Sequence, residues 1–273
     1  MDKPVYPCCL TIAGSDSGGN AGVQADLRAF HAYSLHACTV FAALTAQNPF
    51  GVSAILPVPA DFVAAQLDAV LGVYGIRALK TGMLSEVSAI EVIADRLTAH
   101  PEIAKVIDPV MIATSGAKLV TDAAIAAIER KLVPLATLIT PNIPEAAALA
   151  GIAGDREADV GLARELARRL FDRYGCAVLV KGGHACNSAA VDVLVAGRGE
   201  VCGEFAAPWI PDPVSTHGTG CSLAAALAAE LALGRELPDA VRGAKAYVHR
   251  AIETSFLVGK NCGTLGFGAP ASE

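Results

Sequence analysis

A glycine-rich block, Gly218-Thr219-Gly220-Cys221, directly precedes a run of alanine and leucine residues in this 273-residue chain. Alanine and leucine favour helices, so the block is predicted to open a helix that continues to Leu233. The first turn of a helix offers unpaired N–H groups at the positive end of the helix dipole, which suits an anion such as a phosphate. The dipole would also favour the thiolate form of Cys221. A capped helix with a buried cysteine is the alternative for the block alone.

Four further polar side chains directly follow segments that are predicted to be buried strands. They are Asp108, Asn142, Glu145 and Lys181. Carboxylate and amide oxygens suit Mg²⁺ held against phosphates, with Asp108 and Glu145 as the expected ligands. A lysine can pair with a phosphate as a point charge. With the glycine block, these residues make up a phosphoryl-transfer site, in which catalysis is mostly positioning and charge stabilisation. Each residue alone could instead cap a loop or lie at the surface.

The segments that must position these residues alternate between strands and helices. The predicted strands span 8–15, 36–45, 52–58, 76–81, 105–107, 137–140 and 177–180, with a hairpin at 191–195 and 201–206. The predicted helices span 23–33, 61–71, 87–97, 122–132, 159–171, 223–233 and 239–254. This alternation predicts an α/β fold with a mainly parallel sheet and helices on both faces. The polar strand ends would meet at the carboxyl edge of that sheet, where ligands bind.

The composition fits one sizeable domain. Hydrophobic residues make up 53% and charged residues 18%, and no repeat or linker divides residues 1–273, so a single domain is expected. The net charge of -6 argues against a nucleic-acid or anionic-membrane partner. The eight cysteines form no Cys-x-x-Cys pair, so neither zinc nor a disulfide framework is expected, and a cytoplasmic location fits better. No signal peptide and no membrane-spanning run is predicted.

Seven motifs follow one another in the order of a known family. They are Gly14-Ser15-Asp16-Ser17-Gly18-Gly19 with Ala21 to Asp26, Ala46-Gln47-Asn48, Lys80-Thr81-Gly82-Met83-Leu84, Asp108-Pro109-Val110-Met111, Thr140 to Ala146, Val180-Lys181-Gly182-Gly183-His184, and His217-Gly218-Thr219-Gly220-Cys221. This pattern, from about residue 8 to residue 256, resembles the hydroxymethylpyrimidine/phosphomethylpyrimidine kinases, a branch of the ribokinase superfamily. The first and last motifs are the most specific.

The resemblance implies a three-layer ribokinase-like fold and a phosphotransferase of thiamine biosynthesis. The implied donor is ATP with Mg²⁺, and the implied acceptors are a pyrimidine alcohol and its monophosphate, which becomes the diphosphate. Small molecules are thus the expected partners, and a homodimer is also expected.

The resemblance further implies roles for individual residues. Gln47 would pair with a ring nitrogen and an exocyclic amine of the pyrimidine. The other residues expected at that pocket are Gly14, Thr45, Met83 and Val110, with Asp26 as a weaker candidate. The residues expected on the phosphate and metal side are Asp108, Asn142, Glu145, Lys181 and Thr219. Gly218, Thr219 and Gly220 would form an anion hole, with Cys221 where many relatives carry a catalytic Asp.

Two positions depart from the pattern. Asn20 replaces a common glycine, and because Asn tolerates left-handed dihedral angles, the loop shape is expected to persist. Cys262 stands where a His is usual, which puts a role of the tail in doubt. Two other functions remain open: a pyridoxine or pyridoxal kinase on the same fold, and a binding protein that has kept the fold without the activity.

Overall fold

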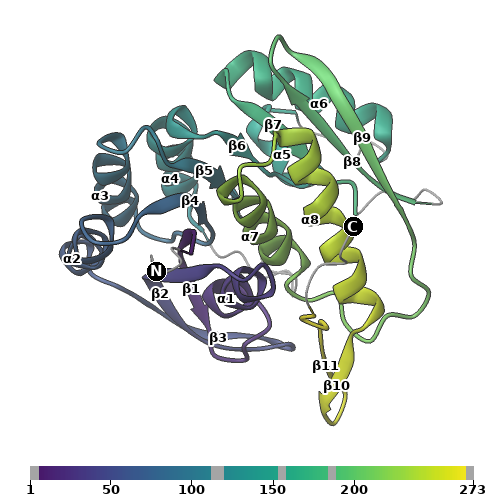
Figure 1. Cartoon of the computed structure of the whole chain (residues 1–273), viewed down its shortest axis with the longest axis horizontal. Coiled ribbons are helices and arrows are strands. Elements are labelled where there is room, and N and C mark those ends of the chain that lie inside the picture. Colours follow the sequence, from purple (N-terminus) through teal and green to yellow (C-terminus); the bar gives the residue numbers. More distant parts are fainter. Residues whose placement is uncertain (1–5, 112–119, 153–157, 184–188, 269–273) are drawn as a thin grey trace, which may run out of the picture.

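The computed structural model describes residues 6–111, 120–152, 158–183 and 189–268, and it places nine strands in one sheet. The strand order is β3-β2-β1-β4-β5-β6-β7-β8-β9 (Figure 1). The pairs from β2 to β7 are parallel, and the pairs toward β3, β8 and β9 are antiparallel. The predicted α/β fold with a mainly parallel sheet is therefore confirmed.

The bounds of the elements follow the predicted alternation. The strands of the large sheet are β1 Cys8–Asp16, β2 His36–Asn48, β3 Gly51–Pro57, β4 Ile76–Thr81, β5 Ala104–Ile107, β6 Leu138–Ile139, β7 Ala177–Val180, β8 Ala189–Ala196 and β9 Glu200–Pro208. The helices are α1 Gly22–Ala32, α2 Ala60–Leu71, α3 Val87–Thr98, α4 Asp122–Ala127, α5 Ile143–Leu149, α6 Val160–Tyr174, α7 Thr219–Ala232 and α8 Leu237–Glu253. Strands β10 Phe256–Gly259 and β11 Cys262–Thr264 form a separate hairpin.

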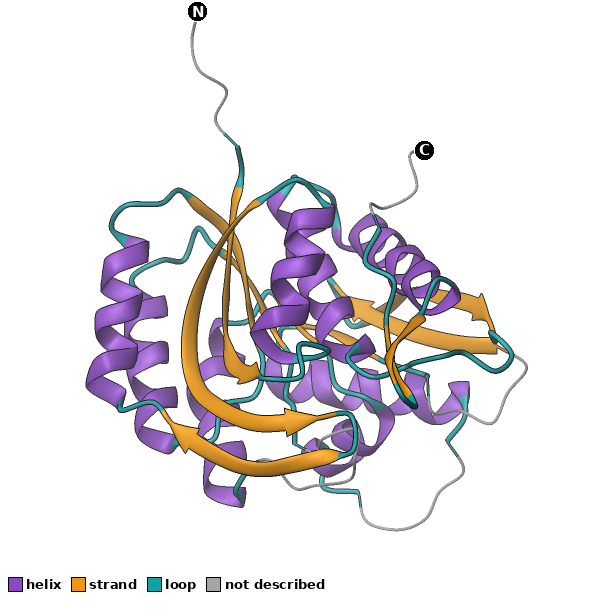
Figure 2. Ribbon diagram, turned by 90° about the horizontal axis from the view of Figure 1, so that it is seen from below, coloured by secondary structure: helices purple, strands orange, loops and turns teal. Residues whose placement is uncertain are grey.

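Helices cover both faces of the sheet, which makes three layers (Figure 2). One buried cluster joins alternate strand residues, such as Leu10 and Leu79, to α2, α3, α4, α5 and α6. The other cluster joins the intervening residues, such as Cys9 and Ala78, to α1, α7 and α8. Because successive side chains of a strand point to opposite faces, the almost wholly apolar strands bury both faces of the sheet.

Helix α7 packs on the sheet against β1, β4 and β5, with the helices α1 and α8 beside it (Figure 1). Most of its residues are buried, in agreement with its alanine- and leucine-rich sequence. Short alanine side chains allow neighbouring elements to approach closely on several sides. The rigid helix fixes the position of its first turn, which carries Cys221.

Two predicted boundaries were wrong. The single helix expected over 122–132 ends at Ala127 and continues as a π-helical turn, Ile128–Leu132, and a 3₁₀ turn, Val133–Leu135. Pro134 lacks an N–H group and disfavours α geometry at the preceding residue, so a regular helix cannot continue. The other difference follows α8, where no element was predicted: this segment forms the β10–β11 hairpin, with Asn261 at a φ of 59° in its turn.

Among the described residues, no helix combines the length and the apolar character that crossing a membrane requires.

Candidate active site

The glycine block adopts the predicted position at the start of α7. Gly218 is the N-cap with a φ of 87°, and a Cβ atom there would lie 1.9 Å from the carbonyl oxygen of Asn20. Only glycine fits this combination of left-handed backbone and close approach. The first-turn N–H groups of Thr219 and Gly220 therefore lie at the end of a nearly buried helix, where they can bind an anion. Lys181 reaches the same turn, since its Nζ lies 3.7 Å from the position of a Cβ atom on Gly220.

A buried ion pair joins two of the predicted strand ends. Lys181 Nζ donates to Asp108 Oδ1 at 2.9 Å, and Thr140 Oγ1 donates to the same oxygen at 3.0 Å. Burial alone would lower the pKa of Lys181, but the carboxylates of Asp108 and Glu145 outweigh burial and raise it. The lysine is therefore positively charged. The Lys181 ammonium and the Asp108 carboxylate therefore lie beside the first turn of α7, which can bind an anion.

Asn142 and Glu145 form a capping box at the start of α5, which is the local alternative considered for Asn142. The Asn142 side chain accepts from the Glu145 N–H at 2.8 Å, and Glu145 Oε2 accepts from the Asn142 N–H at 2.9 Å. Glu145 Oε1 also accepts from the Met111 N–H at 3.3 Å. Burial raises the pKa of Glu145, and the nearby Lys181 opposes that shift. Glu145 thus ties the exits of β5 and β6 together beside Asp108.

Cys221 lies in the first turn of α7, partly buried. Burial raises the pKa of its thiol, while the Lys80 ammonium and the Gly22 N–H lower it by a smaller amount. Burial therefore acts against the thiolate that the dipole was expected to favour, and the pKa of the thiol lies above its ordinary value.

Asp26, the weaker candidate for the pyrimidine pocket, is fully buried beside Lys80. Its side chain has no exposed surface; it accepts from Thr11 Oγ1 at 2.6 Å and from Lys80 Nζ at 3.0 Å. Lys80 in turn approaches the backbone of Gly82, where a Cβ atom would lie 2.8 Å from Nζ. This burial argues against direct contact between Asp26 and a substrate. Lys80 was not predicted to have a role, although a lysine within the apolar strand 76–81 was a sign of a buried pair.

The other residues of the predicted pyrimidine pocket gather around the end of β1. Gly14 lies against Met83, whose Cε would be 2.5 Å from a Cβ atom on Gly14. Thr45 Oγ1 donates to the Ser15 carbonyl at 2.7 Å and lies 3.1 Å from Gln47 Oε1. The contact with Thr45 orients the Gln47 amide, which is partly exposed. Val110 follows β5 and packs against the apolar cluster beside Met111.

The first glycine-rich loop is closed by Asp16. Its carboxylate accepts from the N–H groups of Gly18, Asn20 and Ala21 at 2.8–3.0 Å, and His217 Nε2 lies 3.8 Å away. This carboxylate joins the loop to the residue that precedes Gly218. The left-handed dihedral expected for Asn20 is absent, because Gly19 and Gly22 take that conformation. The Asn20 amide instead donates to the Gly263 carbonyl at 3.3 Å, which connects the loop to β11.

Asp16→Asn is expected to lower the free energy of unfolding near pH 7 by about 1–3 kcal/mol, because a buried amide replaces an acceptor of three N–H groups. Burial tends to raise the pKa of Asp16, but His217 and the loop N–H groups together lower it. The wild type is therefore more stable than Asp16→Asn by the full amount above the unfolded-state pKa of about 3.9. This difference in the free energy of unfolding is lost as the pH falls through the lower folded-state pKa. Urea unfolding of the two proteins at several pH values measures the stability difference near pH 7 and its dependence on pH. A stability difference that grows on acidification contradicts the prediction.

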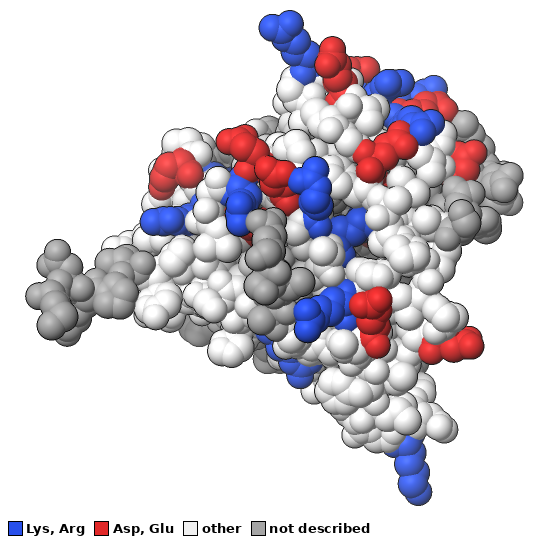
Figure 3. Space-filling model, turned by 45° about the vertical axis from the view of Figure 1, so that its right-hand side comes forward, with Lys and Arg blue, Asp and Glu red and all other residues white. Residues whose placement is uncertain are grey.

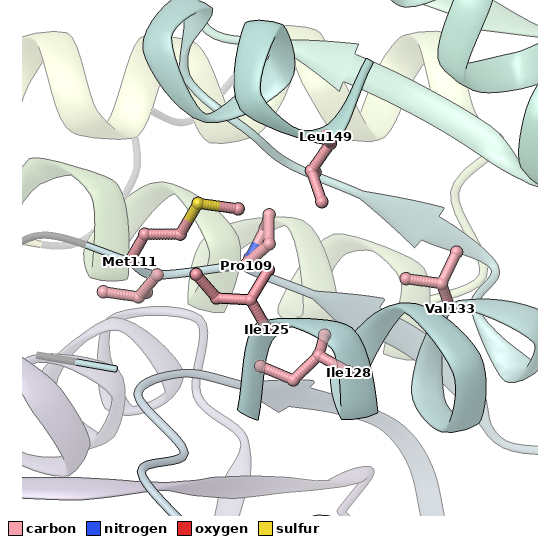
Figure 4. A pocket seen from close by; sticks show the side chains of 7 residues that line it. Pro109, Met111, Ile125, Ile128, Val133 and Leu149 are labelled. Carbon is pink, nitrogen blue, oxygen red and sulfur yellow. The ribbon is translucent and has the colours of Figure 1, made fainter. Parts of the chain in front are cut away.

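A small apolar cavity lies beside the site but does not belong to its chemistry. It is lined by Pro109, Val110, Met111, Ile125, Ile128, Val133 and Leu149. The labelled side chains come from the segment after β5, from α4 and the turns after it, and from α5 (Figure 4). Such a lining offers a ligand no hydrogen-bonding side chain. We interpret it as a packing defect between the sheet and its helices.

Known proteins resemble this chain in sequence and in fold. A sequence model of the family described as phosphomethylpyrimidine kinase matches residues 16–266. A hydroxymethylpyrimidine/phosphomethylpyrimidine kinase of Rhizobium meliloti is 46% identical over 248 residues, which are 90% of each chain. A thiamine biosynthesis bifunctional protein of Geobacter sulfurreducens is 44% identical over 94% of this chain, which spans 51% of that protein. The fold is similar to that of Bacillus subtilis pyridoxal kinase in an ADP complex, with a TM-score of 0.87, 34% identity, and coverage of 97% and 98% of the two chains.

Proposed function

This chain belongs to the phosphomethylpyrimidine kinase family, and from that membership we propose how its site works. The protein is a phosphotransferase of thiamine biosynthesis that phosphorylates hydroxymethylpyrimidine and then the resulting monophosphate. The observation that carries the assignment to this site is the juxtaposition of Lys181 and Asp108 with the N-terminal turn of α7. A positive charge and oriented N–H groups beside each other stabilise the charge that develops on a transferring phosphoryl group.

ATP is the donor in this family of kinases, and we assign its terminal phosphates to Lys181 and to the N–H groups of Gly218, Thr219 and Gly220. The charged Lys181 is anchored on Asp108, so its position does not depend on the nucleotide. Asn142 contributes by fixing the start of α5. Cys221 lies in the same turn; once its thiol proton has passed to solvent, the thiolate can take the acceptor proton and become a thiol again.

We also propose that Mg²⁺ accompanies the nucleotide. Asp108 and Glu145 supply oxygen donors at the exits of β5 and β6, and such hard ligands hold Mg²⁺ best together with water and phosphates. The ion would neutralise charge on the phosphates, while Lys181 and the α7 turn bind them. Turnover that persists after complete chelation of divalent ions contradicts the magnesium proposal.

Gln47→Leu is expected to raise KM for the pyrimidine by roughly 5- to 100-fold, because a lost amide partner costs about 1–3 kcal/mol. Gln47 lies at the end of β2, on the far side of β1 from Lys181, so the KM for ATP should change little. Steady-state kinetics with each substrate varied in turn measures both constants. An unchanged pyrimidine KM would place acceptor recognition elsewhere.

A coupled ADP-release assay tests the function as a whole. Hydroxymethylpyrimidine and its monophosphate should both support turnover, with kcat/KM well above that for pyridoxine or pyridoxal. The second candidate, a pyridoxal kinase, is favoured by the similarity to the Bacillus subtilis structure. A higher kcat/KM for pyridoxal supports that candidate, and absence of turnover with any of these alcohols supports a binding protein.

We further propose that the chain forms a homodimer in the cytoplasm. Apolar side chains are exposed on the curved β2–β3 ribbon, among them Leu44, Phe50 and Leu56, and Figure 2 shows that ribbon extending beyond the layers of helices. The projecting end of the molecule that carries β10 and β11 is also largely uncharged on the face shown in Figure 3. Exposed apolar surface of this kind is typical of an interface, and a second copy would bury it.

Leu56→Asp is expected to shift the dimer toward the monomer at micromolar concentration, because a buried unpaired carboxylate disfavours the interface. Val73→Asp is the control, since Val73 is also exposed, at 77% against 64% for Leu56, but follows α2 and not the ribbon. Light scattering after size exclusion gives the mass of each variant. A monomeric wild-type protein contradicts the proposal.

A further inference from the structure

Three side chains with metal-binding atoms meet at the edge of the sheet opposite the candidate active site. Cys8 is the first residue of β1, His36 is the first residue of β2, and Cys38 follows two residues later on the same face of β2. The parallel register pairs Cys8 with His36. Parallel pairing of the two strand starts therefore brings Cys8 close to His36 and Cys38, although Cys8 and His36 are 28 residues apart in the sequence.

The separations within this Cys8–His36–Cys38 cluster suit a single metal ion. The two sulfur atoms are 3.6 Å apart, and all three potential ligand atoms lie within 4.8 Å of one another. Two sulfur ligands at about 2.3 Å from a tetrahedral zinc ion would lie about 3.8 Å apart. The sulfur separation is thus already close to that of a zinc site. Among the described residues, this is the one group of three or more such side chains that meets this geometric condition.

The exposure of the three side chains would let a metal ion reach the cluster from solvent. Cys8 and Cys38 are buried, whereas His36 is exposed. The His36 ring stacks on Tyr74 with a centroid distance of 5.2 Å, which restrains its orientation. The cluster opens into a surface hollow that is also lined by His31, Tyr74 and Phe267. Solvent in that hollow can reach the ion and supply a fourth ligand.

We propose that Cys8, His36 and Cys38 bind one Zn²⁺ ion, with water as the fourth ligand. Two sulfur ligands and an imidazole favour zinc over the harder Mg²⁺ and Ca²⁺ ions. The ion would join the first residues of two neighbouring parallel strands. Its position, at the amino edge of the sheet, separates it from phosphoryl transfer at the carboxyl edge.

Cobalt substitution in the reduced, chelator-treated full-length protein tests this site directly. Co²⁺ should give thiolate charge-transfer absorption and intense tetrahedral ligand-field bands at about one equivalent, and Zn²⁺ should abolish both. Competition with a chromophoric chelator then gives the zinc affinity. His36→Ala and Cys38→Ser should weaken it by about 100-fold or more, because changes even in residues that only support a ligand cost 10–100-fold.

His31→Ala and Cys202→Ser are the matched controls. His31 is exposed and lines the same hollow, and Cys202 is an exposed thiol on β9, so both variants should bind zinc as the wild type does. His36→Ala changes an exposed side chain and should fold even if the cysteine variants do not. The proposal is overturned if the wild type shows no charge-transfer band with Co²⁺. It is also overturned if His36→Ala leaves both the band and the zinc affinity unchanged. Zinc should also raise the melting temperature of the wild type but not that of His36→Ala.

Discussion

Lys80→Met should lower the free energy of unfolding by about 3–5 kcal/mol, because it leaves the carboxylate of Asp26 buried without a counter-charge. Both side chains have no exposed surface, and Lys80 Nζ lies 3.0 Å from both carboxylate oxygens. Burial alone would lower the pKa of Lys80, but Asp26 outweighs burial and raises it. Burial also raises the pKa of the Asp26 carboxyl, against the effect of Lys80. The contacts of Nζ with both carboxylate oxygens are those of an ion pair. Chemical denaturation of the purified variant measures the change.

The double variant Asp26→Asn with Lys80→Met separates an unpaired charge from a poorly packed side chain. Removal of both charges should recover much of the lost stability, since apolar or neutral replacements of a buried pair are often tolerated. Arg96→Ala is the comparison at the surface, because the Arg96–Asp68 pair is exposed and should contribute little. Equal destabilisation by the single and the double variant would show that packing, and not charge, is responsible.

The second large effect concerns Cys221 and the two acceptors. Cys221→Ala should lower kcat for the pyrimidine alcohol by about 10²–10⁴-fold, the usual contribution of a general base, because the Cys221 thiolate, formed when the thiol loses its proton to solvent, accepts the hydroxyl proton. The monophosphate carries about −1.5 to −2 charges near pH 7, and its attacking oxygen is largely deprotonated, so the second step needs less help from a base. The neutral thiol in the structure adds no negative charge beside that acceptor.

Cys221→Asp therefore should lower the ratio of second-step to first-step kcat/KM. A carboxylate a few ångströms from a phosphate in a partly desolvated site costs about 1 kcal/mol or more, which corresponds to at least about fivefold. Cys221→Ser is the matched control, because its hydroxyl stays neutral and should leave the ratio close to that of the wild type. An unchanged or increased ratio in Cys221→Asp would falsify the idea that cysteine serves both steps.

Local signals in the sequence determined most of the elements and several site residues. Strands β4 and β7 were predicted with their observed bounds, because short apolar runs ended by Gly82 or Lys181 leave little ambiguity. The glycine block was predicted to open a helix, which begins at Thr219, four residues before the predicted span 223–233, and a capping role was the alternative considered for Asn142. These features depend on residues within a few positions of one another, whose preferences the sequence displays directly.

Only the tertiary structure decided which distant side chains became partners. Asp26 lies on α1 and Lys80 on β4, and their pairing follows from the order β2-β1-β4 and from the packing of α1 on that part of the sheet. The same strand order places Cys8 beside His36 and Cys38, where spacing along the chain had argued against a zinc site. Desolvation likewise reversed the thiolate expectation for Cys221, because burial is set by the elements packed around a residue and not by its neighbours in the chain.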